Sequence, residues 1–462
     1  MAKAHLESPR ESVIPAKAGI HFDFDNSNLD PGFRRDGEQK HEQTLRGRIH
    51  VKHGYPFKSE HFSDKGEFIV LTPGNFWEAG GFKQQAGKEK FYDAEFPTEY
   101  LHKRGDLIVA MTEQAAGLLG SMAFVPEDNR YLHNQRIGKV TATSDDVYLG
   151  FLYYAFRMQS VRTQLSNTAS GSKVRHTSPE RIYEISIPLP PAADQKHIAA
   201  VLSALDAKID LNNRINAELE ALAKTIYDYW FVQFDFPDAH GRPYRSSGGA
   251  MVWNDTLKRE IPAGWVDDVL GNIVENLDSK RVPLSRQQRE QRSGSVPYYG
   301  ATGLMGYVDD FLFDEDLLLL AEDGSVMDDR GKVIVQRVWG KAWVNNHAHV
   351  LRPSSGWTVD LLYHALRDVS AVRMMSGSIQ KKITQDNLNA TRLLVPPESL
   401  RRSLARSLRP IRERQKEASE ESAVLTRLRD WLLPLLMNGQ VRVAPSSDAA
   451  SAPALEPVAE PA

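Results

Sequence analysis

The chain has 462 residues, of which 41% are hydrophobic and 25% are charged, a balance typical of water-soluble globular proteins, and its length predicts two or three domains. The formal net charge of −3 excludes a uniformly basic surface for unspecific nucleic-acid binding, but it leaves room for local basic loops. There is no cysteine, which excludes disulfides, thiolate metal sites and cysteine catalysis and agrees with a reducing compartment.

The N-terminal stretch, residues 1–44, is rich in Pro, Gly, Asp and Arg and shows no sustained hydrophobic period, so we expect a disordered or foreign extension. It lacks the apolar core of a secretory signal. No run in the chain approaches the roughly 18 apolar residues that a membrane span needs. We therefore expect a cytoplasmic protein that has no membrane partner.

Residues 45–191 are predicted to form a first mixed domain. Short runs of aliphatic and β-branched residues indicate strands at 49–51, 68–71 and 107–111, and an amphipathic pattern indicates a helix at 148–159. Strands and helices mixed in this way favour the α+β class.

A long helix is predicted over residues 192–236, directly after Pro190 and Pro191. About 40 residues at roughly 1.5 Å each make a rod near 60 Å, so we interpret it as a spacer or assembly element. Asn212 and Asn216 either lie in its apolar seam, where a buried amide fixes the register, or face solvent. The seam follows alternating steps of four and three, as in a coiled coil, through Ile198, Leu202, Leu205, Ile209, Leu219, Ala223, Ile226 and Trp230.

The second half of the chain repeats this plan. Residues 237–260 are rich in Gly, Ser, Pro and Arg and are interpreted as a linker. Residues 261–397 are predicted to form a second mixed domain, with strands at 311–313, 316–321 and 332–335.

A second long helix is predicted over residues 398–438, and Pro410 should interrupt and kink it. The last residues, 439–462, are mostly Pro, Ala, Ser and Glu and are expected to be a disordered tail. The seam of this helix runs through Leu404, Leu408, Ile411, Leu425, Leu428, Leu432 and Leu435.

The two halves also match in detail. Gly171 lies in a Ser-Gly-Ser segment and Gly377 in another, and the same interval separates Pro190 from Pro396. These matches indicate a tandem duplication of a domain plus a helix. A duplication around a pseudo-twofold makes the two long helices antiparallel.

No catalytic motif is recognisable. Lys332 follows Gly324 at the wrong spacing for a phosphate-binding loop. Glu322–Asp323 with Asp328–Asp329 could bind a divalent cation, but a solvated acidic loop is the favoured interpretation. His347–His349 is a weak hint of zinc, for which a structural or DNA-facing role is preferred. We therefore predict neither a catalytic nor a metal site in this chain.

Several segments occur in an order that is more specific than any of them alone. In that order they resemble the specificity subunit of a type I restriction–modification enzyme, although the first domain lacks the Ile-Pro-x-Gly-Trp opening of residues 261–265. The segments are Pro190–Gln195, Leu211–Asn216, Tyr229–Phe231, Gly300–Gly303, Gly306–Asp310 and Glu322–Gly324, together with the paired Ser-Gly-Ser stretches.

The resemblance implies two target-recognition domains, each reading one half of a split double-stranded DNA site, and two long antiparallel helices that hold them apart. It also implies two methyltransferase subunits docked on those helices and translocating endonuclease subunits that join the complex. S-adenosylmethionine, ATP and magnesium belong to those partners, so this chain is expected to hold no cofactor and to be no enzyme. The local twofold symmetry of duplex DNA fits two related readers.

Candidate DNA contacts are polar and basic loop residues, because phosphate contacts position a protein and base-edge contacts specify sequence. In the first domain they are Lys52, Tyr55, Lys58, Ser59, Lys83, Gln84, Gln85, Ser172, Lys173, Arg175 and His176. In the second they are Lys280, Arg281, Tyr298, Tyr299, Ser378, Gln380, Lys381 and Lys382. Each has a plain alternative, a solvated surface residue without a function.

Two other functions stay open. The chain could be a self-contained restriction endonuclease with a disguised nuclease site, or a coiled-coil scaffold that binds only proteins. Magnesium-dependent cleavage by the chain alone would favour the first, and failure to bind DNA even with partners would favour the second.

Overall fold

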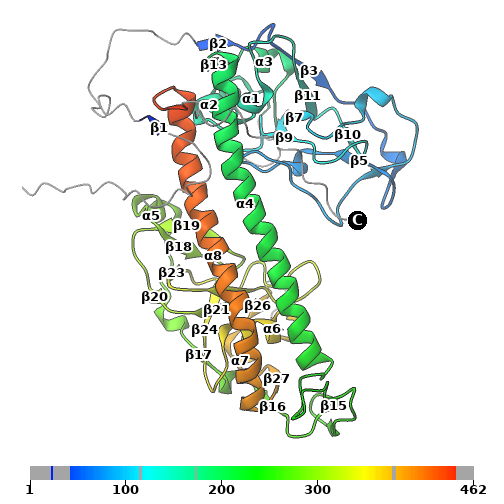
Figure 1. Cartoon of the computed structure of the whole chain (residues 1–462), viewed down its shortest axis with the longest axis vertical. Helices are drawn as coiled ribbons and strands as arrows, with labels where there is room; N and C mark the ends of the chain where they lie inside the picture. Colours follow the sequence, from blue (N-terminus) through cyan, green and yellow to red (C-terminus); the bar gives the residue numbers. More distant parts are fainter. Residues whose placement is uncertain (1–21, 24–41, 114–116, 172–173, 377–380, 444–462) are drawn as a thin grey trace, which may run out of the picture. The chain divides into compact units, whose positions relative to one another are not determined.

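The computed structural model describes residues 22–23, 42–113, 117–171, 174–376 and 381–443 (Figure 1). It divides into two compact units. The first unit contains residues 1–210 and 423–462, and the second contains residues 211–422. Each unit holds one mixed domain and a part of each long helix, and each is described by itself.

The first unit is built on two four-stranded sheets. The larger sheet, which has the longer strands, is antiparallel. Its order is β3 (Ile49–His53), β11 (Ile137–Ala142), β7 (Leu107–Ala110) and β9 (Met122–Phe124). The other has the order β10 (Tyr131–His133), β5 (Phe68–Leu71), β6 (Phe91–Tyr92) and β4 (Phe62–Ser63). β10 and β5 are parallel, and all four residues of β7 are buried.

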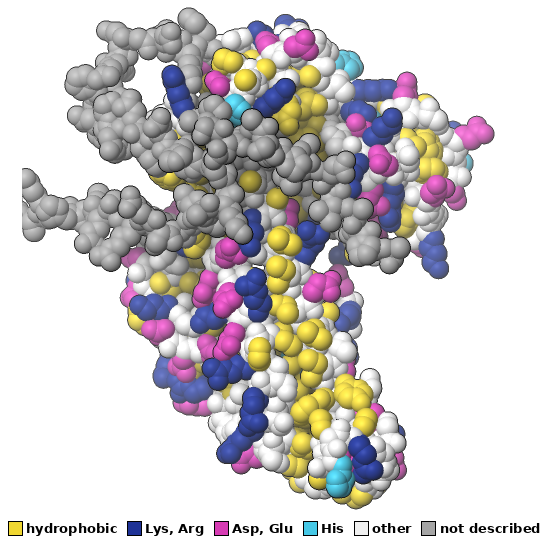
Figure 2. Space-filling view, in the orientation of Figure 1, with side chains coloured by type: hydrophobic (Ala, Val, Ile, Leu, Met, Phe, Trp, Pro, Cys, Tyr) yellow, Lys and Arg dark blue, Asp and Glu magenta, His cyan; other side chains and the backbone are white. Residues whose placement is uncertain are grey.

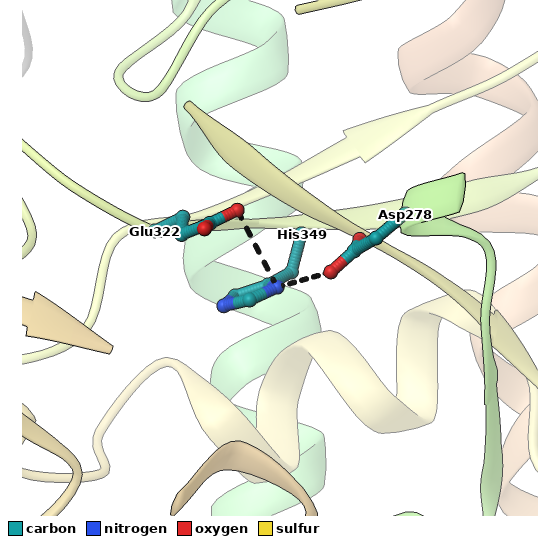
Figure 3. A group of neighbouring side chains, drawn as sticks. All are labelled: Asp278, Glu322 and His349. Carbon is teal, nitrogen blue, oxygen red and sulfur yellow. Dashed lines mark hydrogen bonds and ion pairs between the residues drawn. The ribbon is translucent and has the colours of Figure 1, made fainter. Parts of the chain in front are cut away.

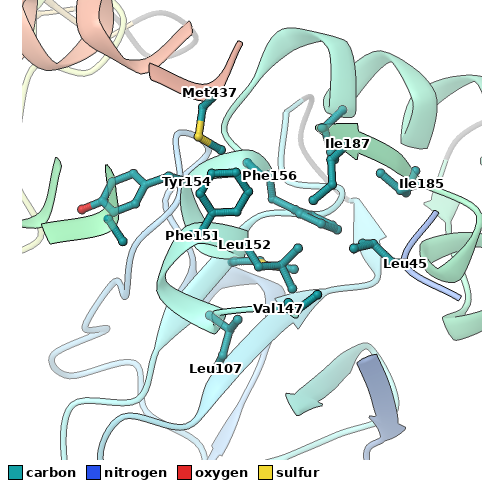
Figure 4. Packing of buried hydrophobic residues seen from close by; sticks show 14 of the residues in the cluster. Leu45, Leu107, Val147, Phe151, Leu152, Tyr154, Phe156, Ile185, Ile187 and Met437 are labelled. Atoms are coloured by element: carbon teal, nitrogen blue, oxygen red, sulfur yellow. The ribbon is translucent and has the colours of Figure 1, made fainter. Parts of the chain in front are cut away.

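Helices cover the core of the first unit, as Figure 4 shows around α1 (Leu149–Ala155). Phe151 and Leu152 of this helix pack with Leu45 and Ile187 and with Met437. The helix predicted over 148–159 is split, because α1 ends at Ala155 and the chain is extended before the next helix. The other helices of this domain are α2 (Gln159–Thr168) and α3 (Pro179–Tyr183).

The second unit repeats the strand order of the larger sheet, and its smaller sheet also contains one parallel pair although its strand order differs, which confirms the internal duplication. Its larger sheet has the order β17 (Val274–Asn276), β24 (Ala348–Pro353), β21 (Leu317–Ala321) and β22 (Val335–Val338). Its smaller sheet has the order β19 (Leu304–Val308), β18 (Val296–Tyr299), β23 (Lys341–Val344) and β20 (Phe313–Asp314), with β18 and β23 parallel. The helices are α5 (Arg286–Gln291), α6 (Val359–Leu366) and α7 (Gln385–Asn389).

Short antiparallel pairs complete both units. In the first they are β2 (Glu42–Thr44) with β13 (Ser186–Pro188), β8 (Thr112–Glu113) with β12 (Arg175–His176), and β1 (Phe22–Asp23) with β28 (Arg442–Val443). In the second they are β16 (Val266–Val269) with β27 (Arg392–Val395), β25 (Met375–Ser376) with β26 (Lys382–Ile383), and β14 (Met251–Asn254) with β15 (Arg259–Pro262).

The two long helices are α4 (Ala192–Tyr227) and α8 (Glu398–Met437), green and orange in Figure 1. In the second unit Asn212 Nδ2 donates to Glu421 Oε2 at 2.8 Å and Asn216 Nδ2 donates to Ser419 Oγ at 3.0 Å. Rising numbers on α4 meet falling numbers on α8, so the helices are antiparallel as predicted. Asn212 is buried and both amides face α8, which confirms their place in the seam.

The ends and the interior of the long helices differ from the prediction. α4 ends at Tyr227 rather than at residue 236, because a π turn follows and Phe234 has a left-handed φ of 68°. α8 continues through Pro410, which lies exposed on its solvent side. The predicted interruption is wrong, because a carbonyl that loses its partner there can bond to water.

The predicted linker, residues 237–260, is folded. It carries the hairpin of β14 and β15, and Tyr244 stacks on Phe236 with ring centroids 4.6 Å apart. Phe236 in turn stacks on Trp265 at 5.5 Å. Aromatic residues hold this segment despite its Gly- and Ser-rich composition, which therefore misled the prediction.

Three other predicted boundaries differ from those in the structure. The first domain begins at Glu42 instead of residue 45, because β2 pairs with β13. The strand predicted at 311–313 is only Phe313–Asp314, and that at 332–335 begins at Val335. Strands 49–51, 68–71, 107–111 and 316–321 are confirmed to within two residues. Among the described residues, the helices are too short or too polar to cross a membrane.

Candidate nucleic-acid interface

Three neighbouring strand ends form one edge of the larger sheet in the first unit. Tyr55, just after β3, forms a bridge with Asn134, just before β11. Met111, just after β7, donates its N–H to Arg136 O at 2.8 Å and accepts the N–H of Thr177 at 2.9 Å. This edge therefore joins segments that are far apart in the sequence. We call it the first rim, made of Tyr55, Met111–Glu113, Asn134–Arg136 and Arg175–Thr177.

One group of predicted DNA contacts lies beside the first rim, at β3. Lys52 Nζ is 2.9 Å from Glu99 and 4.6 Å from the centre of the Tyr100 ring. The Tyr55 ring lies 5.3 Å from the same Tyr100 ring. Lys52 and Tyr55 are thus half-buried neighbours, while the two other predicted residues of this group are exposed, namely Lys58 and Ser59.

A second group of predicted contacts lies on a loop with an exposed indole. Lys83 Nζ is 4.5 Å from the centre of the Trp77 ring, which is 53% exposed. The next residue, Glu78, lies against Gly117, at the end of the loop that follows β8. Gly117 N–H donates to Glu113 Oε1 of the rim, which links this loop to the rim. The remaining predicted residues of the group are exposed or half-buried, namely Gln84 and Gln85.

β12 brings the third group to the same place. Arg175 Nη1 lies 3.6 Å from Glu113 Oε2, and Arg175 also donates to Ser166 Oγ at 2.8 Å. His176 is exposed, and its Nδ1 lies 3.0 Å from Thr112 Oγ1. The third group is therefore part of the rim, with Arg175 held by internal bonds. Two predicted residues lie outside the described residues, namely Ser172 and Lys173.

The second unit has an equivalent edge. Glu322, just after β21, donates its N–H to His347 O at 2.9 Å and accepts the N–H of Ile383 at 2.9 Å. Asp278, just after β17, accepts the N–H of Val350 at 2.8 Å. The same strand ends therefore meet as in the first unit. We call this edge the second rim, made of Asp278–Arg281, Glu322–Asp323, Asn346–His347 and Lys381–Ile383.

The lysines predicted in the second domain lie on the second rim. Lys280 and Lys381 are exposed, and Lys382 Nζ is 2.8 Å from Glu322 Oε1. Tyr299 is half-buried in the neighbouring sheet. Two predicted residues lie outside the described residues, namely Ser378 and Gln380.

Two predicted contacts in the second domain are corrected. The side chain of Arg281 is only 12% exposed, and its Nη1 donates to Glu322 at 2.5 Å and to Ala348 O at 2.7 Å. Tyr298 is 1% exposed, and its hydroxyl accepts the Leu284 N–H at 3.2 Å. Arg281 supports the rim from inside and Tyr298 belongs to the core, so the available surface does not include them.

Two long stretches of the chain match one known protein family. Residues 42–221 and 262–408 match the family model of the type I restriction modification DNA specificity domain. These two stretches make up well over half of the chain. The chain belongs to this family. Its specificity subunits recognise the DNA target and are the non-catalytic subunits of the restriction–modification complex.

Individual relatives agree with this assignment. The chain is 26% identical over 319 residues to the type I restriction enzyme MjaIX specificity subunit of Methanocaldococcus jannaschii, covering 65% of this chain and 70% of that protein. It is 31% identical over 141 residues to the putative type I restriction enzyme specificity subunit S.HindORF215P of Haemophilus influenzae, covering 30% and 35%. The crystal structure of the type I restriction–modification S subunit from M. genitalium has the same fold, with a TM-score of 0.52 and 16% identity, covering 87% of this chain and 98% of that one.

A buried group of three side chains underlies the second rim (Figure 3). His349 Nδ1 lies 2.6 Å from Asp278 Oδ2 and 3.8 Å from Glu322 Oε2. Its other ring nitrogen, Nε2, lies 2.8 Å from Ile383 O, so the imidazole connects β17, β24 and β26. It supports the strand that carries Lys382, which agrees with the structural role preferred from the sequence.

These three side chains do not fit a metal ion. Arg281 lies 2.5 Å from Glu322 and 3.5 Å from Asp278, and Lys382 also contacts Glu322. Two cations therefore already neutralise the carboxylates, and both nitrogens of His349 are engaged in hydrogen bonds. An ion would have to displace a buried guanidinium.

The pKa values of both carboxylates are shifted. Burial acts to raise the pKa of Asp278, but hydrogen bonds from His349 and Val350 N–H outweigh it, so the pKa lies below its ordinary value. Burial likewise acts to raise the pKa of Glu322, and hydrogen bonds from Lys382 and Arg281 lower it further than burial raises it. Both carboxylates are therefore stabilised in the ionised form, which pairs with the surrounding cations.

The other residues that were considered as cation ligands form pairs of their own. His347 Nδ1 lies 2.5 Å from Asp323 Oδ1, so His347 and His349 contact different acids. Asp328 accepts from Arg330 Nε at 2.9 Å. The favoured interpretation of this segment as an acidic loop agrees with these contacts.

Some rim residues were missed from the sequence. Gln135 and Arg136 are exposed in the turn before β11, and His347 is exposed at the equivalent turn before β24. The signal was present, because the segments around Asn134 and Asn345 resemble each other in the two halves. Trp77 had no such counterpart, and only its exposure in the structure identifies it.

Proposed function

We propose that the chain is the specificity subunit of a type I restriction–modification complex that reads a split double-stranded DNA target, one half per rim. The proposal is carried by one observation: the family's DNA specificity domain occurs twice, and the equivalent strand ends of both domains gather exposed basic and amide side chains. Family membership supports target recognition, and the geometry supports the rims as the place where it occurs.

The side chains on the rims suit the two parts of DNA recognition. Lysine side chains neutralise phosphates without reading sequence, and Asn, Gln and Arg reach base edges in the major groove. The first rim offers Arg136 and Gln135, and the second offers Lys280, Lys381 and Lys382. Because the two rims differ in residue types, their half-sites are expected to differ.

The long helices are the proposed docking surface for methyltransferase subunits. An exposed apolar stripe follows one side of α4 and of the π turn after it, formed by Leu211, Leu222, Tyr229 and Val232. Figure 2 shows hydrophobic side chains, in yellow, along the face where the long helices run. Exposed apolar patches of this kind mark protein interaction sites.

The remaining chemistry is assigned to partners. We place S-adenosylmethionine, ATP and magnesium in the methyltransferase and translocating endonuclease subunits, and no cofactor in this chain. The helices then separate the two domains and set the unread gap of the target. The complex acts on chromosomal and incoming DNA and is therefore proposed to be cytoplasmic.

The experiment is methylome sequencing in a host without restriction–modification systems of its own. The gene is expressed with and without its methyltransferase partner. We expect a new split motif with a fixed gap only when both are present. No new motif despite an assembled complex would contradict the proposal. Cleavage by the purified chain with magnesium would favour a self-contained nuclease, and binding of partners without DNA would favour a scaffold.

A further inference from the structure

In each unit one carboxylate of α4 is shared between the recognition domain and α8. In the first unit it is Asp206, and in the second it is Glu220. We call these two residues the domain anchors. Both lie on the helix at positions where only part of the side chain reaches solvent, with 22% exposed in each case.

Asp206 binds three side chains from two directions. Tyr154 Oη, on α1 of the recognition domain, donates at 2.8 Å, and Arg157 Nη1, just after α1, donates at 3.0 Å. Arg429 Nη1, on α8, donates at 2.8 Å to the other carboxylate oxygen. Both oxygens are therefore occupied, one by the domain and the other by the second helix.

Glu220 is likewise bound by two side chains of the recognition domain and by one of α8. Arg337 Nη2, on β22, donates at 2.6 Å, and Arg367 Nη1, just after α6, donates at 2.5 Å. Gln415 Nε2, on α8, donates at 3.3 Å. Arg157 and Arg367 follow equivalent helices of the two domains, so the arrangement was built twice from the repeated fold.

The anchors sit in surroundings that strengthen these bonds. Burial acts to raise the pKa of Glu220, but the charge of Arg337 and the other groups around the carboxylate together outweigh burial, so the pKa lies below its ordinary value. Burial raises the pKa of the Tyr154 phenol, and the charge of Asp206 raises it further, so Tyr154 stays a donor. Charge-assisted bonds with fork-shaped guanidinium groups are strongly directional.

Such bonds hold the recognition domain on the helix and also fix its position along the helix axis. A slide of the domain by one helical turn is about 5.4 Å and would separate each carboxylate from both of its donors in the recognition domain. The same slide corresponds to between one and two base pairs of duplex, at about 3.4 Å each. Apolar contacts along a helix are less selective for position, because one aliphatic side chain can replace another.

We infer that Asp206 and Glu220 are positioning residues that fix each recognition domain along the long helices and thereby restrict the complex to one gap length. The inference rests on the proposed function, in which the helices set the gap. Under this inference, two side chains that are not part of the rims contribute to target specificity by fixing the gap length. The rims alone determine the sequences of the half-sites.

The test measures affinity of the assembled complex for duplexes that keep both half-sites but vary the gap by one or two base pairs. The discrimination is the affinity at the native gap divided by that at the altered gap. We expect Asp206→Asn and Glu220→Gln to lower it about tenfold, with both half-sites still required. Arg157→Lys and Arg367→Lys keep the positive charge but lose the fork-shaped guanidinium group. They should lower the discrimination by a smaller factor.

The controls remove exposed ion pairs of α8 that do not contact the anchors. Glu398→Gln removes an exposed partner of Arg402, and Glu413→Gln removes an exposed partner of Arg409. Both should leave discrimination unchanged. An equal loss of affinity at every gap, or unchanged discrimination in all anchor variants, would overturn the inference. A wild-type complex that tolerates every gap would instead overturn the proposed function, and the inference with it.

Discussion

At the scale of single residues, burial decides which of the predicted contacts are available at the surface. Residue type and loop position identified Lys280, Lys381 and Lys382, which lie on the second rim. The same reasoning selected Arg281 and Tyr298, which are internal. A sequence pattern cannot separate these cases, because a guanidinium that supports a loop and one that binds phosphate carry the same charge and occur in the same kind of segment.

Buried histidines make the stability of each unit depend on pH. In the first unit burial and the neighbouring His102 lower the pKa of His133 to about 3, and in the second burial lowers that of His364 to about 4. Both folded-state pKa values lie below the ordinary value of 6.5, so the folded protein favours the neutral form. Their contribution to stability is fully present above pH 6.5 and is lost as the pH falls toward 3 to 4.

We expect the free energy of unfolding of the first unit to fall by about 1.4 kcal/mol between pH 7.5 and 5.5 because of His133 alone. Denaturant titrations at the two pH values measure this loss. His133→Phe should remove that part of the dependence, and His240→Phe, at an exposed position, should not. The same loss in wild type and His133→Phe would contradict the explanation.

At the scale of elements, β26 is the piece of the second rim whose function is most accessible to test. His349 holds its backbone through Ile383 O, and two exposed lysines lie at its start, Lys382 on the strand and Lys381 just before it. The two lysines were predicted because basic residues recur after the Ser-Gly-Ser segments of both halves. The support of this strand by Asp278 and His349 was not predicted, because those residues come from segments that are distant in the sequence.

Lys381→Ala with Lys382→Ala should weaken DNA binding and flatten its salt dependence. Each lost phosphate contact removes about 0.9 from the slope of log affinity against log salt, so the pair removes up to about 2. Lys258→Ala, at an exposed position outside the rims, is the matched control. An unchanged slope in the double variant would exclude these lysines from the interface.

At the scale of the whole molecule, the sequence predicted the plan better than the boundaries. Repeated segments and heptad-like spacing predicted two mixed domains and two antiparallel helices, all of which the structure contains. Boundaries failed where pairing is long-range, as at β2, or where aromatic packing overrides composition, as at Tyr244. The domain anchors could not be predicted from the sequence, because each anchor joins residues from separate segments of the chain.

The central claim is that each rim reads its own half of a split target, and the affinity of the assembled complex for duplexes with one scrambled half-site tests it most directly. We expect wild type to lose affinity whichever half is scrambled. A complex carrying Gln135→Ala and Arg136→Ala should lose part of its discrimination at the first rim's half-site and keep full discrimination at the other. Equal changes at both halves, or wild-type binding that ignores both, would contradict the account.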